Sequence, residues 1–419
     1  MSTNFRPSGT IGSLDEYLKA LDSLVSAEKA LGYESLVKGT PLESTAEEII
    51  YRLKEWKDRN VYGIKSDGSG HEAGQRFFHG LDLVSDSKLA HALPQFGVFA
   101  QAAPPAETNM FHETYVSGLW MRYSSFLQRF PGGVAKAETW LYKRMVLQPD
   151  DAYHQKQTVN GAFGKNFVRA VTVIRSMLGY ETAYREHFRR ALWKFAQDGI
   201  MYAEIRVALD YGFFIRSGDG IRDIKQREAL QILQEVLRKE TPKIRAAGHL
   251  FYGAKFIYAC MRSSSRDATL WCMINCIEMK QLFPDLICGF DSQGQEDTGH
   301  PLSYWVPDLL EMRAKITALN IDLSFILHAG ETLDHGGETD SNLYDAILLD
   351  TKRIGHGFSI TKHPLLMQIC KERRIAIETC PISNEVLGLV PTTKSHHLPV
   401  LLANCVPCTV NSDDPGSWQ

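Results

Sequence analysis

The sequence lacks the features that mark membrane proteins and nucleic-acid-binding proteins. No run of about 18 apolar residues occurs, so nothing in the sequence predicts a membrane-spanning helix. Neither charge is in excess: 46 Lys and Arg residues against 49 Asp and Glu residues give a net charge of −3. Near-neutral charge disfavours binding to nucleic acid or to an anionic membrane surface. The first twenty residues contain no apolar core of signal-peptide length, so we expect a cytoplasmic protein.

Disulfide frameworks and phosphate-binding glycine loops are also missing. The eight cysteines are scattered and lie mostly in apolar segments, which favours free buried thiols in a reducing compartment. Cys405 and Cys408 have Cys-x-x-Cys spacing within an apolar run, and we interpret them as core residues rather than a redox pair. No Walker or dinucleotide-binding loop is present. These absences direct attention to other kinds of active site.

The first 110 residues predict a helical extension followed by loops. One helix is expected from Ser13, a candidate N-cap, and another from Ser44, where Glu47 would complete a capping box. Gly, Ser, Pro and Ala dominate residues 60–110, which indicates loops. We assign 1–110 to the extension and 111–419 to the main domain. Two interpretations stay open: helices that pack on the core, and a dimerising extension that would make the protein a homodimer.

From residue 201 onward, short apolar runs alternate with helical stretches. Near-continuous apolar strands separated by helices indicate a parallel sheet that is covered on both faces. This number of units in so short a stretch favours a (β/α) barrel over an open sheet. The seven runs are "MYAEIRVAL", "AKFIYACMR", "LICGFDSQG", "SFILHAGE", "RIGHGFS", "IAIETCPISN" and "PCTVNSDDP".

Polar side chains follow these strands, where barrel active sites are built. A single histidine after an apolar run is most often a core residue, but imidazoles and carboxylates from five strands are costly to bury without a task. Both are zinc-ligand types, and zinc with an open position makes hydroxide near neutral pH. The sequence therefore predicts a metal-assisted hydrolase. The residues are Glu204, Arg206, Arg262, Asp291, Gly294, His328, Glu331, His356, Asn384, Asp413 and Asp414.

Three motifs, in this order, resemble the adenosine deaminase family of the metallo-dependent hydrolase superfamily: "HAGE" at 328–331, "RIGHG" at 353–357 and "NSDDP" at 411–415. "YAEIR", "GFDSQG" and "CPISN" are similar to the family's strands two, four and seven. The N-terminal extension and "SNEVLGL" are most similar to the branch called adenosine deaminase-related growth factors, whose members are often secreted. The resemblance implies a TIM-type (β/α)8 barrel and Zn²⁺-dependent hydrolytic deamination of adenosine or 2′-deoxyadenosine to inosine and ammonia.

The resemblance also implies roles around a metal-bound water. His328 matches a zinc ligand of the family. Asp413 matches the carboxylate that binds zinc and holds the attacking water. His356 matches the residue that orients this water and helps to deprotonate it.

A second group of residues matches the family's contacts to the purine. Glu331 matches the acid that protonates N1 of the ring, Asp414 the group that contacts N7, and Gly294 the backbone donor to N3. The two residues between His328 and Glu331 are Ala329 and Gly330, whose small size permits the backbone and a ligand to approach each other closely. The expected partner is adenosine or a related 6-aminopurine nucleoside.

One family motif is missing from the sequence. The family carries His-x-His at the end of its first strand, and none of the fourteen histidines here has that spacing. By order, the first strand should fall within 75–105, where "FGVFA" is the only strand-like run and His79 and His91 are the only histidines. An acidic residue that is common in the family is replaced by Gln295.

These departures leave three interpretations open. The family continues beyond the "NSDDP" motif through helices that close the barrel, so we expect a barrel that lacks its first strand and its closing helices. The chain is then a working deaminase with substitute ligands such as His79 or His91, a purine-binding or regulatory relative without catalysis, or an incomplete deaminase. Two of four family ligands make a poor zinc site, so weak zinc binding and slow turnover are expected.

Overall fold

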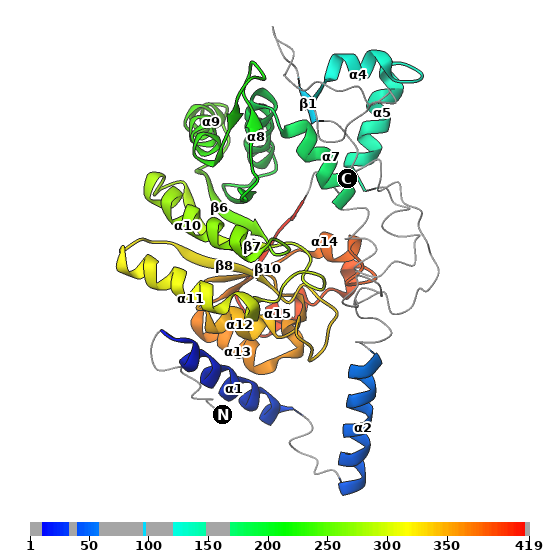
Figure 1. The fold of residues 1–419 in the computed structure, drawn as a ribbon, viewed down its shortest axis with the longest axis vertical. Coiled ribbons are helices and arrows are strands. Elements are labelled where there is room, and N and C mark those ends of the chain that lie inside the picture. Colours follow the sequence, from blue (N-terminus) through cyan, green and yellow to red (C-terminus); the bar gives the residue numbers. More distant parts are fainter. Residues whose placement is uncertain (1–10, 33–39, 58–94, 98–119, 148–167, 415–419) are drawn as a thin grey trace.

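The computed structural model describes residues 11–32, 40–57, 95–97, 120–147 and 168–414. Figure 1 shows a curved sheet in the middle of the molecule, with helices α10 to α13 along its outer side and α1 running beneath them. Over these residues, no helix combines the length and the hydropathy needed to cross a bilayer. All eight cysteines are free thiols, as the sequence predicts. The interpretation of Cys405 and Cys408 as core residues is wrong for Cys405, which is exposed, and Cys408 is only partly buried.

The sheet contains seven strands, and each apolar run identified in the sequence forms one of them. Their order across the sheet is β11-β10-β9-β8-β7-β6-β3, and each neighbouring pair is parallel. Helices connect successive strands, so the predicted partial TIM-type barrel is confirmed. The strands are β3 (Tyr202–Ala208), β6 (Gly253–Met261), β7 (Ile287–Gln293), β8 (Ser324–Ala329), β9 (Arg353–His356), β10 (Ala376–Thr379) and β11 (Cys408–Val410).

The connecting helices pack apolar side chains against the sheet, and Trp305 and Phe290 are among the fully buried residues of this core. A hairpin of β4 (Ile215–Arg216) and β5 (Asp223–Ile224) follows β3. The helices are α8 (Glu181–Gln197) before β3, then α9 (Gln226–Ala246), α10 (Arg266–Leu282), α11 (Leu302–Ala318), α12 (Asn342–Leu348), η5 (Phe358–Lys362), α13 (Pro364–Arg373), α14 (Pro381–Val386), η6 (Thr393–Ser395) and α15 (Leu398–Ala403).

Ion pairs across the inner face show how strongly the sheet curls. Arg206 on β3 contacts Glu378 on β10 at 2.7 Å between Nη2 and Oε2. These strands are five positions apart in the order of the sheet, and in a flat sheet they would be about 24 Å apart at about 4.8 Å per strand. Glu204 on β3 likewise pairs with Arg353 on β9. The seven strands therefore wrap into a partial barrel with charged side chains inside it.

The expected position of the first strand holds a strand that belongs to a different sheet. Within "FGVFA" and the residue before it, β1 (Gln95–Gly97) forms and pairs in parallel with β2 (Trp120–Arg122). In the described part of the chain, neither β3 nor β11 has a second neighbour, so no strand lies between them. His79 and His91 lie outside the described residues.

A small second core lies beside the two-stranded sheet. It is formed by α4 (Tyr123–Arg129), α5 (Val134–Met145) and α7 (Val168–Leu178). Met121, Phe126, Ala137, Leu141 and Val173 are its buried side chains. The predicted division at residue 110 falls in a stretch outside the described residues, and it stays a prediction.

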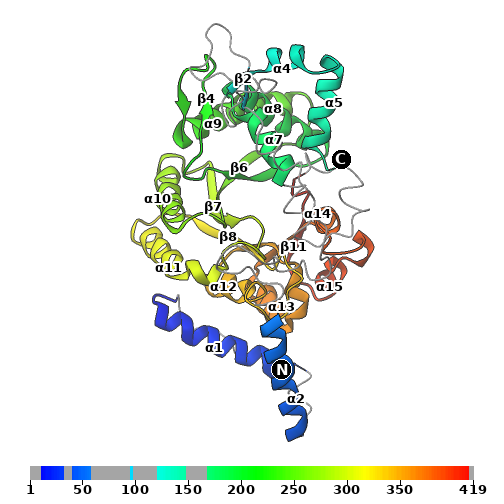
Figure 2. The same cartoon turned by 45° about the vertical axis from the view of Figure 1, so that its right-hand side comes forward.

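The two N-terminal helices behave differently. Helix α1 (Leu14–Leu31) begins after Ser13, whose side chain caps Glu16 N–H as predicted, and packs on α12 and α13. Helix α2 (Pro41–Lys57) stands away from the body in Figures 1 and 2. The predicted start of α2 at Ser44 is wrong. Thr40 and Glu43 form the capping box at 2.7 and 3.3 Å, because Pro41 has the fixed φ that suits a first helical position.

Candidate active site at the carboxyl ends of the strands

His328 is held in place by a buried aspartate that sequence analysis did not assign to any role. The Nδ1 atom of His328 lies 2.5 Å from Oδ2 of Asp291, and the backbone N–H of His328 donates to Oδ1 at 2.9 Å. Burial by itself would raise the pKa of Asp291, but the charges of His328 and Arg206 outweigh it and keep this pKa well below its usual range. The carboxylate therefore fixes the proton on Nδ1 and leaves Nε2 without a proton and able to bind a metal, which is the usual arrangement of a metal-binding histidine.

Glu331 is the buried acid of the site. Its side chain is 5% exposed. Burial, together with the charges of Asp413 and Glu296, raises its pKa well above the usual range. A carboxyl group that keeps its proton at neutral pH can act as a general acid. This is the state that protonation of a purine nitrogen requires.

A second acid, Glu296, shapes the turn between His328 and Glu331. Its carboxylate accepts the backbone N–H groups of Gly330 at 3.0 Å and Glu331 at 3.1 Å. Gly330 has a φ of +80°, and a Cβ there would lie 2.8 Å from Oγ of Ser359. Gly330 is therefore needed for close packing against Ser359. This reason adds to the ligand access that the sequence analysis predicted for a small residue here. Gln295 stands where the family commonly has an acidic residue. The next residue, Glu296, supplies a carboxylate that holds the turn through these two backbone N–H groups.

His356 is a neutral base at neutral pH. Burial lowers its pKa from 6.5 to about 4. Its Nδ1 atom lies 3.3 Å from Oε1 of Glu331 and 3.3 Å from the amide nitrogen of Asn384, while Nε2 lies 3.7 Å from Oδ2 of Asp413. Asn384 in turn contacts Nε2 of His396 at 2.9 Å. His356 is therefore oriented from both sides.

The two aspartates after β11 lie at the rim of the site. Asp413 has a φ of +56° and His356 a φ of +58°, a left-handed conformation that is uncommon for residues other than glycine and is concentrated at functional sites. Asp414 retains exposed surface, yet surrounding protein atoms and the charge of Asp413 raise its pKa to about 8. The structure thus brings Glu331, His356 and Asp413 together, with His328 beside them: the rings of His328 and His356 are 5.1 Å apart.

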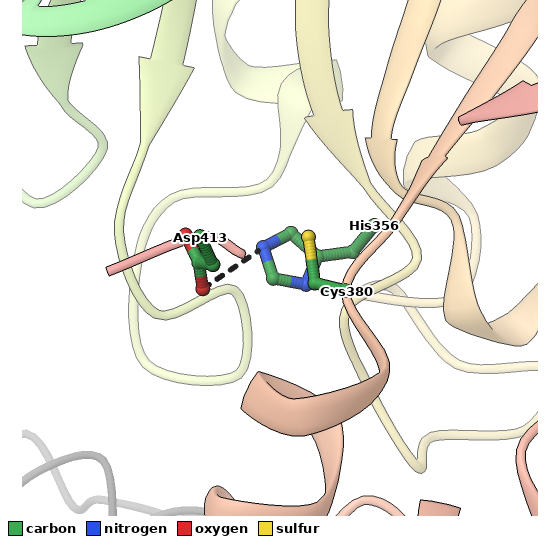
Figure 3. Close-up of side chains that lie close together, drawn as sticks. All are labelled: His356, Cys380 and Asp413. Carbon is green, nitrogen blue, oxygen red and sulfur yellow. Dashed lines mark ion pairs between the residues drawn. The ribbon is translucent and has the colours of Figure 1, made fainter. Parts of the chain in front are cut away.

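Cys380 joins the site from the end of β10 without having been predicted. Figure 3 shows its sulfur and the Asp413 carboxylate both close to the His356 ring. One donor atom from each of these three residues lies within 4.8 Å of the other two. Burial, and then the negative charge of Asp413, raises the pKa of the Cys380 thiol well above its usual range. The "CPISN" motif placed this cysteine at a strand end, which was the available signal.

The other strand-end residues divide into two groups. Gly294, with a φ of +108°, directly follows β7, and Arg262 follows β6 and donates to the carbonyl oxygen of His328 at 2.7 Å. Glu204 was expected at the mouth, and this is wrong: it is the third residue of β3 and pairs with the first residue of β9. Arg206 lies deeper as well, against Asp291 at 2.7 Å.

Next to the site, His397 is a buried histidine with both ring nitrogens unpaired within the described part of the chain. Its ring packs against His396 at 4.2 Å and Phe358 at 5.0 Å between centroids. Burial, and then the neighbouring His396 and His356, lower its pKa from 6.5 to about 3. The unfolded chain binds this proton below pH 6.5 and the folded chain does not, so protonation favours unfolding.

We expect the His397→Leu variant to be less acid-sensitive than the wild-type chain. Between pH 7.5 and pH 5, His397 should lower the free energy of unfolding by about 2 kcal/mol, and the variant should not show this loss. The measurement is urea unfolding at both pH values, with His335→Gln as the control at an exposed histidine. Parallel pH dependences of wild type and His397→Leu would contradict the expectation.

The fold and the site together define a class of enzyme. A parallel, strongly curled sheet carries a buried acid with a raised pKa, a histidine with a lowered pKa and an aspartate at the carboxyl ends of its strands, which is where barrel hydrolases place their catalytic groups. The family model described as "Adenosine deaminase" matches residues 149–419. The chain belongs to the adenosine deaminase family, and it is an aminohydrolase-type enzyme.

Relatives and solved structures agree with this assignment. The "Adenosine deaminase" of Lutzomyia longipalpis is 36% identical over 413 residues, covering 91% of this chain and 78% of the relative. The "Adenosine deaminase 2" of Sus scrofa is 31% identical over 327 residues, covering 76% of this chain and 59% of the relative, in line with the growth-factor branch. A structure of Arabidopsis ADAL complexed with IMP shares the fold, with a TM-score of 0.51, 17% identity and coverage of 78% and 83%.

Proposed function

We propose that the chain deaminates adenosine or 2′-deoxyadenosine by hydrolysis, releasing ammonia and the inosine nucleoside. The observation that carries the proposal is Glu331, a buried acid whose pKa is raised well above its usual range and whose Oε1 lies 3.3 Å from Nδ1 of His356. Attack of water at C6 of a purine needs a proton donor at the ring nitrogen N1, and a neutral carboxylic acid is suited to that role. The family membership supports deaminase chemistry, and the choice of nucleoside is the finer part of the proposal.

Zinc is the proposed cofactor, and the donor atoms at the site fit it. His328 has its Nδ1 proton fixed by Asp291, so Nε2 is free to bind a metal. Asp413 adds a carboxylate, which is also a ligand type of zinc, and its donor atom lies within 4.8 Å of those of His356 and Cys380. When bound, zinc supplies a water molecule whose pKa is lowered to about 7.

Each remaining role is assigned to a side chain of this protein. Glu331 donates its proton to N1 as the water oxygen adds to C6. His356, neutral at pH 7, orients the water and accepts its proton, while Asp413 holds it from the other side. Asp414 and Gly294 are proposed to position the purine through N7 and N3, as the family resemblance implies.

A second candidate function is purine binding with little or no turnover. Two observations favour it: none of the fourteen histidines is spaced as His-x-His, and no strand lies between β3 and β11 in the described part of the chain. Both features remove groups that the family uses to hold zinc. Homodimer formation, a cytoplasmic location and the absence of nucleic-acid partners remain predictions.

A single purified sample distinguishes the two candidates. Zinc is measured by elemental analysis, turnover of adenosine and of 2′-deoxyadenosine by ultraviolet absorbance, and inosine binding by calorimetry. Near-stoichiometric zinc with enzymatic turnover supports the deaminase. Inosine binding without turnover supports the second candidate. If the chain neither binds inosine nor turns over a nucleoside, both candidate functions are contradicted.

A further inference from the structure

The turn that carries Glu331 is held from two sides by buried charged side chains. Arg262, which follows β6, donates through Nη2 to the carbonyl oxygen of His328 at 2.7 Å. Glu296 accepts the backbone N–H groups of Gly330 and Glu331 at 3.0 and 3.1 Å, each through a different carboxylate oxygen. Two side chains from outside the turn therefore fix its backbone at both ends.

The two holding side chains also form a buried ion pair. Nη1 of Arg262 lies 3.7 Å from Oε2 of Glu296, and neither side chain is exposed to solvent. Asn342, at the start of α12, donates its amide N–H to the same oxygen at 2.7 Å. A buried ion pair stabilises a fold no better than apolar packing of the same volume. Stability alone is therefore a poor explanation for a pair placed directly behind the acid of the site.

The segment that contains Glu296 also contains Gly294, which is proposed to contact N3 of the purine. One residue separates the two in the segment after β7. N1 and N3 belong to the same six-membered ring, so their partners in the protein must keep a fixed spacing. Because Glu296 binds the backbone of Glu331, it ties the acid that would protonate N1 to the segment that would bind N3.

The charges of the pair support the same arrangement. Burial, and then the negative charges of Asp413 and Glu296, raise the pKa of Glu331, while the positive charge of Arg262 lowers it. Arg262 is engaged with the carbonyl oxygen of His328, and Glu296 offsets the effect of its charge on the acid. The pair therefore holds the turn without drawing the proton away from Glu331.

We propose that Glu296, paired with Arg262, is a positioning residue that fixes the Glu331 carboxyl group at the spacing from Gly294 that protonation of purine N1 requires. The inference rests on the proposed function, and it assigns a role that the family resemblance does not supply. Glu296 acts through the backbone N–H groups of the turn. Its effect on turnover therefore passes through Glu331.

The Glu296→Gln variant tests this role, because an amide group in place of one carboxylate oxygen cannot accept a backbone N–H. We expect kcat for adenosine to fall about 10-fold with little change in KM, since a displaced acid affects the transition state more than substrate binding. The measurement is steady-state kinetics, with kcat normalised to the inosine-binding sites counted by calorimetry. Glu240→Gln is the matched control: Glu240 is also buried and paired, with Lys243, but lies on α9. It should keep wild-type kinetics.

A double variant separates positioning from general damage to the fold. In the Glu331→Gln background there is no acid to position, so adding Glu296→Gln should lower kcat by less than about 2-fold. A further loss of about 10-fold in that background would overturn the role, because the damage would then be independent of Glu331. If circular dichroism shows that Glu296→Gln does not fold, Glu296→Asp takes its place in the cycle. It keeps the charge beside Arg262 but is too short to reach both N–H groups.

Hydrogen exchange decides the inference even in a chain without turnover. The amides of Gly330 and Glu331 should exchange about 10-fold faster or more in Glu296→Gln than in the wild type, while the amides of β8 keep their rates. Unchanged exchange at these two amides would overturn the role of Glu296 and leave the deaminase proposal intact. Faster exchange in the variant of a chain whose wild type does not turn over adenosine would support the hold of Glu296 on the turn and overturn the deaminase proposal.

Discussion

Replacing Glu331 by glutamine should lower turnover by about 10²–10⁴-fold, the usual contribution of a positioned general acid. The variant keeps the shape of the side chain but has no acidic proton. The proton is needed only as charge develops on the purine ring, so the loss should fall on kcat and leave KM and inosine binding nearly unchanged. Removing a buried carboxyl group whose pKa is strongly raised should not destabilise the fold.

The measurement is steady-state kinetics with adenosine, together with calorimetric binding of inosine. Glu311→Gln is the matched control, because Glu311 lies on α11, away from the site, and pairs with Lys315 on the protein surface. That variant should retain wild-type kinetics. Equal losses in inosine binding and in turnover would show that Glu331 positions the substrate instead of protonating it.

Replacing Asp291 by asparagine should have the second-largest effect, a loss of about 10–100-fold in metal affinity and turnover. Asp291 touches neither substrate nor reacting atoms, and it acts through His328, so it is a positioning residue. Its carboxylate accepts both the ring Nδ1–H and the backbone N–H of His328. An amide in its place can donate to Nδ1, which would move the ring proton to Nε2 and block that atom as a ligand.

Two readouts separate this role from a purely structural one. The proton chemical shifts of the histidine rings report the tautomer of His328, and zinc titration reports the metal affinity. Asp308→Asn is a suitable control, because Asp308 is also buried and pairs with an arginine, Arg266, but lies on α11. Similar losses of zinc affinity in both variants would show that Asp291 matters only for stability.

The strands and most site positions could be predicted from the sequence because both depend on local pattern. Parallel strands that are covered on both faces must be apolar along their length, so β6, β7 and β8 stand out in the sequence. A polar residue at the end of such a strand, or directly after it, must lie at one edge of the sheet. That reasoning placed His328, Glu331 and His356 together, and the structure agrees.

Other features depend on which residues meet across the fold, and no local pattern reveals them. Asp291 was expected at the mouth of the barrel, but its pairing with His328 follows only from the register of β7 and β8. Glu204 was expected at the strand end because an apolar run does not show where a strand starts and stops. It is the third residue of β3, not the last. The place of Cys380 beside His356 and Asp413 follows from the packing of three strand ends, which no local pattern shows.

The attachment of α1 also has a consequence for synthesis of the chain. Tyr17 donates its hydroxyl to Asp345, 328 residues further along the sequence, and Glu28 accepts backbone N–H groups at the start of α13. At a ribosomal rate of about 5–20 residues per second, the partner surface emerges on the order of 15–65 s after α1 does. During that interval Tyr17 and Leu24, both fully buried in the finished fold, are exposed to solvent, so the nascent chain should depend on a holding chaperone until the last third of the barrel has been made.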